Sequence, residues 1–123
     1  DMKKFIIFLF LCFSTNATSD WVKFATNDEG SEYFYDINKI RKLGDRVLLW
    51  VRTRYAEPSK YKDQSSEIYQ QINCTEYSFR YIQAIYYRDK NWKSESATEG
   101  KQPKINIPDG SAIAYLANIV CSD

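Results

Sequence analysis

The stretch Arg46–Tyr55 (RVLLWVRTRY) constrains the fold more than any other part of this sequence. Successive side chains of a β-strand point to opposite faces of the sheet. One face therefore carries Val47, Leu49, Val51, Thr53 and Tyr55, and the other carries Leu48, Trp50, Arg52 and Arg54. The first half is apolar on both faces and the second half on one. This pattern predicts a central strand that is covered on both sides near its start.

Other segments predict strands that surround this one. Alternation of apolar and polar residues, and β-branched or aromatic residues, favour strands at 21–25, 32–36, 66–75 and 77–88, with a small edge strand at 105–107. The strands 66–75 and 77–88 form an antiparallel hairpin that turns around 74–77, and alternation puts Tyr77, Phe79, Tyr81, Ile85 and Tyr87 on one face. Residues 37–43 suggest a helical turn. Residues 89–103 predict a long polar loop, which is either mobile or functional.

The C-terminal segment Ala112–Cys121 has the period of a helix. Ile113, Leu116, Ala117 and Val120 recur at i, i+3, i+4 and i+7, and either Asp109 or Ser111 is the N-cap. A helix about 15 Å long is marginal alone in water and needs a sheet beneath it. We therefore predict an α+β fold: one antiparallel sheet of five to six strands with a C-terminal helix on one face.

The N-terminus has the layout of a secretory signal peptide. Met2 is the natural start and Asp1 an extra residue; Lys3 and Lys4 precede the apolar run 5–13, and small residues allow cleavage after Ser19 or after Ala17. The alternative is a short anchor or a buried helix. Residues 1–19 are thus expected to be the signal, and 20–123 a single domain.

Neither a membrane span nor a lipid anchor is expected at this end. A run of nine apolar residues is too short for a span, which needs roughly 20. Cys12 lies inside the apolar run and follows Leu11, whereas a lipidated cysteine follows a small residue. We therefore expect an exported protein that is periplasmic or secreted, or lies at the cell surface without a lipid.

Two cysteines remain after export, Cys74 and Cys121. An even pair in an oxidising compartment normally forms a disulfide, which would tether the helix to the sheet. The alternatives are a redox-active pair or a metal site. The two cysteines lack the CxxC spacing that is usual for either kind of site, and no histidine is present to complete a zinc shell.

Composition excludes several function classes. The absence of histidine removes Ser-His-Asp and Cys-His catalysis and zinc sites of the HExxH type. The net charge of +1 gives no electrostatic case for nucleic acid. The carboxylates Asp28, Glu29 and Glu32 lack the regular ligand spacing of a calcium loop. We expect no cofactor, no metal and no enzymatic activity.

Four residues are candidates for contact with a protein partner. Arg52 and Arg54 share a face of the central strand and could form a cationic strip, with Arg80 or Arg88 beside them. Tyr86 and Trp92, near Tyr87, could form an aromatic patch, because Tyr, Trp and Arg dominate binding hot spots. The alternative for the arginines is an ordinary solvated face with cross-strand ion pairs. For the tyrosines it is the core, since Tyr86 and Tyr87 point to opposite faces.

Several short motifs, taken in order, resemble those of the surface-adhesin protein E family of small exported bacterial proteins. They are Trp21, the Tyr-x-Asp element of 33–36 with the turn 37–40, the Val-x-x-Trp strand 47–50, the Asn-Cys pair 73–74, Phe79-Arg80, the Ile-x-Ile-Pro element 105–108 and the closing Val120-Cys121. The resemblance covers nearly all of the chain after the signal.

The resemblance implies a sheet with a disulfide-tethered C-terminal helix. It also implies display at a bacterial surface and binding of host extracellular-matrix or serum proteins, by analogy with the name-giving member. That member is a lipoprotein, and the chain departs from it in lacking a lipid-attachment motif. The alternative function is that of a periplasmic or secreted accessory or inhibitor protein that acts on a component of the bacterial envelope.

Overall fold

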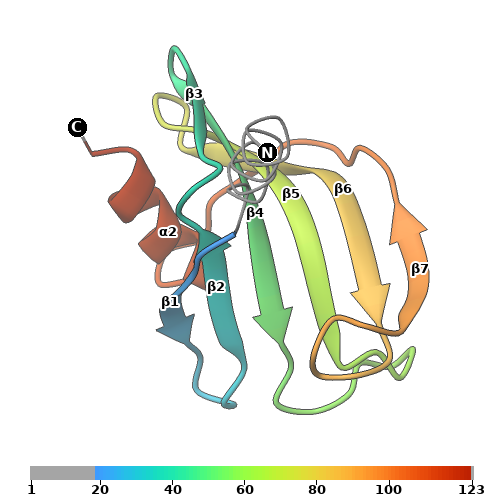
Figure 1. Cartoon of the computed structure of the whole chain (residues 1–123). Coiled ribbons are helices and arrows are strands. Elements are labelled where there is room, and N and C mark those ends of the chain that lie inside the picture. The colour runs from blue at the N-terminus through green and yellow to red at the C-terminus, as the bar shows by residue number, and fades with distance from the viewer. Residues whose placement is uncertain (1–18, 123) are drawn as a thin grey trace, which may run out of the picture.

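The computed structural model describes residues 19–122. Apart from its last residue, the expected signal peptide (1–19) lies outside the described residues. The described chain forms one antiparallel sheet and a short helix (Figure 1). The elements are β1 (Trp21–Thr26), β2 (Glu32–Asp36), β3 (Arg41–Leu43), β4 (Arg46–Arg54), β5 (Ser65–Asn73), β6 (Ser78–Tyr87), β7 (Glu95–Glu99), β8 (Ile105–Asn106) and α2 (Ala112–Val120).

The sheet runs in the order β1-β2-β4-β5-β6-β7, so most strands pair with their neighbours in the sequence. The short strands β3 and β8 pair with β4 and β6. All pairs are antiparallel. The central position of β4 and the β5–β6 hairpin confirm the predictions made from alternation.

The described sheet has eight strands instead of the expected five to six. The additional strands are β3, within the segment expected to be a helical turn, and β7, within the expected polar loop 89–103. Every residue of both strands is exposed. Strands of this kind depend on backbone hydrogen bonds to a neighbour, so their side chains carry no hydrophobic alternation to detect.

Helix α2 covers one face of the sheet near β1 and β2 (Figure 1). Ser111 is the N-cap: its side-chain oxygen accepts a hydrogen bond from the Ala114 N–H. The buried side chains of the helix join a core built from one face of the strands. This core includes Tyr35, Val47, Leu49, Val51, Ile72, Ala114, Leu116, Ala117 and Val120.

A disulfide joins Cys74, in the turn after β5, to Cys121 at the end of α2, as predicted. The bond closes a chain segment with a sequence separation of 47. It therefore holds the end of a nine-residue helix against the sheet, and the position of the helix does not rest on packing alone.

The opposite face of the sheet differs from the expectation that β4 is covered on both sides. Among residues 19–122, no helix or second sheet packs on that face (Figure 1). Leu48 and Trp50 are only half-buried there. Trp50 is shielded from the side by Tyr69, which is directly opposite on β5, with ring centroids 5.0 Å apart. Neighbouring side chains thus replace a covering layer.

A β-bulge in β6 overturns the expectation that its aromatic residues share one face. Tyr69 pairs with Gln83 and Gln70 with Tyr81, which leaves Ile82 as an extra residue. An extra residue reverses the faces beyond it. Phe79 and Tyr81 therefore lie on the helix side, whereas Ile85 and Tyr87 lie on the opposite side.

Candidate functional site

Two arginines of β4 and the aromatic residues around them dominate the face without a helix. Arg52 and Arg54 alternate with the buried Val51 and Thr53, so both point to this face. The antiparallel register places Phe34 opposite Arg52. Trp21 of β1 lies beside them, because its ring stacks on Arg52.

The guanidinium groups stack on these rings in series. The Cζ atom of Arg52 is 4.2 Å from the ring centroid of Trp21 and 4.7 Å from that of Trp92. The Cζ atom of Arg54 is 4.8 Å from Trp92 and 5.6 Å from Phe34. Each distance is within the roughly 6 Å range of a cation–π interaction. We call these five residues, Trp21, Phe34, Arg52, Arg54 and Trp92, the arginine–aromatic face.

Trp92 reaches this face from the loop between β6 and β7. Its backbone is in the left-handed region, with φ of 56°. Its indole Nε1 donates to the backbone oxygen of Ser66 at 2.9 Å, and its ring meets Phe34 edge-on at 5.9 Å. Arg54 Nε also donates to the Lys90 carbonyl of the same loop, at 3.1 Å. Contacts to two strands therefore fix the ring in place.

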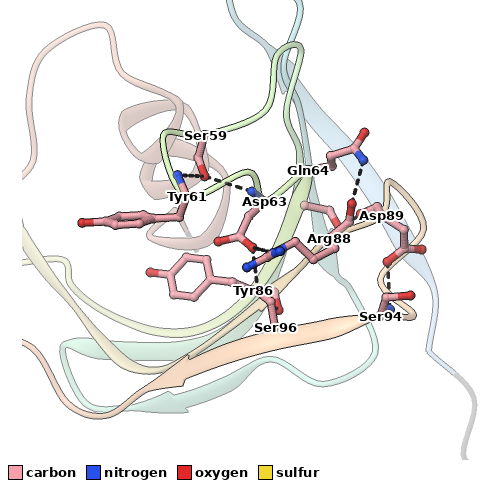
Figure 2. Close-up of polar contacts among 10 residues, drawn as sticks. Ser59, Tyr61, Asp63, Gln64, Tyr86, Arg88, Asp89, Ser94 and Ser96 are labelled. Atoms are coloured by element: carbon pink, nitrogen blue, oxygen red, sulfur yellow. Dashed lines mark hydrogen bonds and ion pairs between the residues drawn. The ribbon is translucent and has the colours of Figure 1, made fainter.

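Asp89 organises the start of the same loop. Its carboxylate accepts backbone N–H bonds from Asn91, Lys93 and Ser94 at 2.9 to 3.1 Å, and Figure 2 shows the contact with Ser94. The bond from Ser94 lowers the pKa of Asp89 most, since it stabilises the ionised form. The aspartate thus closes a turn that carries Trp92 onto the sheet.

Ion pairs surround the stacked groups. Glu32 accepts from Lys23 at 2.8 Å and from Arg54 at 3.0 Å. The hydrogen bond from Lys23, followed by that from Arg54, lowers the pKa of Glu32. Arg52 Nε lies 3.8 Å from Glu67 Oε2, which is an ion pair but too long for a hydrogen bond. Three cations thus meet two carboxylates, and the cluster keeps a positive excess.

The structure brings three of the four candidate contact residues together: Arg52, Arg54 and Trp92. Arg80 shares their face of the sheet but lies away from them, on β6 opposite Gln71 of β5. Neither Trp21 nor Phe34 was named from the sequence as a candidate contact residue. Only the register of β1, β2 and β4 places them beside the arginines, and a register is not visible in a single strand.

Tyr86 lies on the other face of the sheet, away from Trp92. It pairs with Ser66 and Ala97 and lines an open cleft of about 500 Å³ with Tyr55, Tyr61 and Asp63. Figure 2 shows the polar contacts of this cleft. The aromatic patch expected from Tyr86 with Trp92 therefore does not form.

Asp63 is the buried charge of that cleft. It accepts from Arg88 Nε at 3.2 Å and from the Ser96 hydroxyl at 2.6 Å (Figure 2). Arg88 is thereby engaged here and does not extend the strip of Arg52 and Arg54. Burial, followed by the hydrogen bond to Glu99, raises the pKa of Tyr86. Its hydroxyl thus remains a neutral donor.

The described residues offer no centre for metal chemistry. Within residues 19–122 no group of three or more His, Cys, Asp or Glu side chains could hold a metal ion. In the same range no helix is long and apolar enough to cross a membrane. What the arginine–aromatic face can do is make contacts, with flat rings, guanidinium donors and little freedom to move.

Comparison with known proteins gives a family and a fold. The sequence profile described as "Surface-adhesin protein E" matches residues 21–122. Curated protein sequences give no match. Crystal form II of Haemophilus influenzae protein E is similar at a TM-score of 0.62 and 16% identity, over 87% of this chain and 91% of that one. A structure of protein E from non-typeable Haemophilus influenzae is similar at a TM-score of 0.55 and 18% identity, over 87% of this chain and 78% of that one. At these identities the likeness establishes the shared fold.

Proposed function

Because the chain belongs to the surface-adhesin protein E family, we propose that it is an exported binding protein that contacts host extracellular-matrix or serum proteins. The family description names an adhesin, which is a binding protein and not an enzyme. In this proposal the protein acts at the bacterial surface, and the arginine–aromatic face is its contact surface.

The observation that carries the proposal is the stacked series of Trp21, Arg52, Trp92 and Arg54 on an open sheet face. Trp and Arg are enriched in the few residues that supply most of the energy of an interface. Their side chains normally lose rotamer freedom on binding, at about 0.5–1.5 kcal/mol each. Here the stacking contacts hold them in place beforehand, so less of that freedom remains to be lost.

The charges of the face indicate the kind of surface it fits. Arg52 Nε is buried and has no hydrogen-bond partner among the described residues. The positive excess of the cluster favours a partner surface with exposed carboxylates or carbonyl oxygens, as charge complementarity requires. An extended or flat protein surface can reach the rings, because they lie on a sheet and not in a deep pocket.

Surface plasmon resonance of the exported chain (residues 20–123) on immobilised matrix and serum proteins tests this proposal. We expect binding to at least one of them, and a loss of about 30-fold or more for Arg54→Ala or Trp92→Ala, which corresponds to roughly 2 kcal/mol for a hot-spot residue. Arg41→Ala is the matched control, since Arg41 is an exposed arginine on β3. Melting curves confirm that each variant is folded.

Two results would contradict the proposal. One is that the wild-type chain binds no matrix or serum protein but captures a component from an envelope extract, which supports the accessory or inhibitor function. The other is that binding occurs and Arg41→Ala weakens it as much as the two face variants.

A further inference from the structure

A separate cavity lies on the helix side of the sheet, between the start of α2 and strands β1, β2, β4, β5 and β6. It has a volume of about 260 Å³, and its lining includes Ile113 and Leu116 of the helix and Gln70 of β5. Tyr33 and Tyr81 line it as well. It shares no residue with the arginine–aromatic face, so the contact surface proposed above does not use it.

The cavity selects against charge. None of the residues that line it carries a charged side chain, whereas the cleft next to Tyr86 contains Asp63, Arg88 and Glu99. Burial raises the pKa of Tyr81, so its phenol is neutral at physiological pH. A charged ligand would lose its hydration here without gaining a partner, which is costly. A neutral ligand with an apolar body fits.

Gln70 supplies a single polar contact point within these apolar walls. It is only 6% exposed, and its Oε1 has no hydrogen-bond partner among the described residues. Its neighbours on the same face of β5, Ile68 and Ile72, are apolar core residues. A buried acceptor without a partner destabilises the folded state, because it has lost its hydration without gaining a hydrogen bond. A donor that enters the cavity would remove this destabilisation.

The volume sets the size of that ligand. A cavity of roughly 150 Å³ holds benzene, so this one has room for a larger, bicyclic ring. We propose that the cavity binds a neutral, planar aromatic group of indole type, whose N–H donates to Oε1 of Gln70. The group could be a free small molecule or the side chain of a tryptophan in a partner, since both present the same ring and donor.

Titration of the ¹⁵N-labelled exported chain with indole, followed by NMR, tests the proposal. We expect saturable shifts of the amides of Ile113, Leu116 and Gln70. Benzofuran has the same shape but an oxygen in place of the N–H, and we expect it to bind at least fivefold more weakly. Equal or tighter binding of benzofuran, or indole shifts that lie outside the cavity, would overturn the proposal.

The variant Gln70→Leu keeps the size of the side chain and removes the acceptor. We expect it to abolish the preference for indole over benzofuran and to leave the melting temperature of the free protein unchanged or higher. Gln71→Leu, at the adjacent position on the opposite face, is the matched control and keeps the preference. If Gln70→Leu keeps the preference, the assigned contact is wrong.

A second variant keeps the test valid if Gln70→Leu does not fold. Ala112, the first residue of α2, lines the cavity, so Ala112→Trp adds a ring to its wall, and we expect this variant to abolish binding of both probes. Continued binding would contradict the assigned location. N-acetyl-tryptophanamide then distinguishes the sources: tighter binding than indole indicates a protein side chain, and weaker binding a free small molecule.

This inference does not rest on the proposed protein-binding function. Substitutions on the arginine–aromatic face leave indole binding intact, and Gln70→Leu leaves the contact surface of the other face unchanged. Failure of one proposal is therefore visible separately from failure of the other.

Discussion

Arg52 makes contacts that a lysine could not reproduce. Its guanidinium group lies within cation–π distance of the rings of both Trp21 and Trp92. A guanidinium is flat and weakly hydrated and can stack on two rings at once, whereas an ammonium is a compact, strongly hydrated charge. The identity of this residue therefore affects the stability of the cluster as well as its charge.

We expect Arg52→Lys to lower the free energy of unfolding by about 1 kcal/mol, since a cation–π contact contributes roughly 0.5–2 kcal/mol depending on burial. Urea denaturation followed by tryptophan fluorescence measures the change. Arg41→Lys on the exposed strand β3 serves as the control, with a change within about 0.5 kcal/mol. Equal effects of the two substitutions would show that the stacking adds no stability.

Tyr87 gives the fold a dependence on alkaline pH. Burial, together with the nearby Glu67 carboxylate to which its hydroxyl donates, raises the pKa of Tyr87 to about 12. The folded state then holds this proton more tightly than the unfolded state, whose tyrosine titrates near pH 10. The contribution to stability is complete below about pH 10 and is lost as the pH rises toward 12.

We expect the urea midpoint of the wild-type chain to fall between pH 10 and 12, and to fall less in Tyr87→Phe. The comparison with Tyr115→Phe, an exposed tyrosine of α2, separates this effect from general alkaline destabilisation. A decline of the same size in all three proteins would contradict the role given to Tyr87.

Individual residues also show which side-chain orientations can be predicted from the sequence alone. Alternation places Arg52 and Arg54 on one face correctly, because β4 is regular over nine residues. It fails for Tyr81 and Tyr87, because the extra residue Ile82 in β6 reverses the faces. A bulge arises from pairing with a neighbouring strand, and periodicity within one segment does not report it.

At the level of elements, α2 depends on its attachments. The helix has nine residues, and isolated helices shorter than roughly 12–15 residues are marginal in water. Its stability comes from the buried Leu116, Ala117 and Val120 and from the disulfide between Cys121 and Cys74. The sheet has its own backbone ladder and does not depend on the helix in the same way.

We expect reduction of the disulfide to loosen α2 before it affects the sheet. The chain-entropy relation gives about 4 kcal/mol as an upper figure for a loop of this length. Hydrogen exchange measures the loosening of the helix. We expect the amides of residues 114–120 to lose protection on reduction, while those of β4 and β5 keep most of theirs. The double variant Cys74→Ala/Cys121→Ala is expected to match the reduced protein. An unchanged melting temperature and unchanged protection would contradict this role of the tether.

The elements that were predicted are β1, β2, β4, the β5–β6 hairpin, β8 and α2, whose sequences show alternating apolar residues or an apolar helix face. The strands β3 and β7 were missed because all their residues are exposed. The same reasoning applies to the candidate site. Its arginines follow from alternation along one strand, whereas Trp21 and Phe34 join them only through pairing across three strands.

For the whole molecule, the two faces of the sheet carry different groups. The helix side holds the core, the disulfide and the cavity at Gln70. The opposite side presents stacked rings and guanidinium groups with no covering element among residues 19–122. One face thus maintains the fold, which leaves the other free to contact a partner.

Location decides whether that partner belongs to a host. We expect protease treatment of intact cells to remove the protein, and intact mass to show a start near Asp20 without a lipid. A periplasmic marker that stays intact in the same cells is the control. Protection from protease would place the protein inside the envelope and favour an envelope partner. A lipid-sized mass on a chain that starts at Cys12 would overturn the expected cleavage site.

Hydroxyl-radical footprinting of the exported chain, free and bound to the matrix or serum protein that it captures, tests directly whether the arginine–aromatic face makes the contact. Mass spectrometry measures the labelling of each side chain. We predict that labelling of Trp21, Trp92 and Phe34 falls in the complex, while that of the exposed Tyr61 and Tyr115 does not change. Protection of Tyr61 or Tyr115 with no change at the three rings would show that another surface makes the contact.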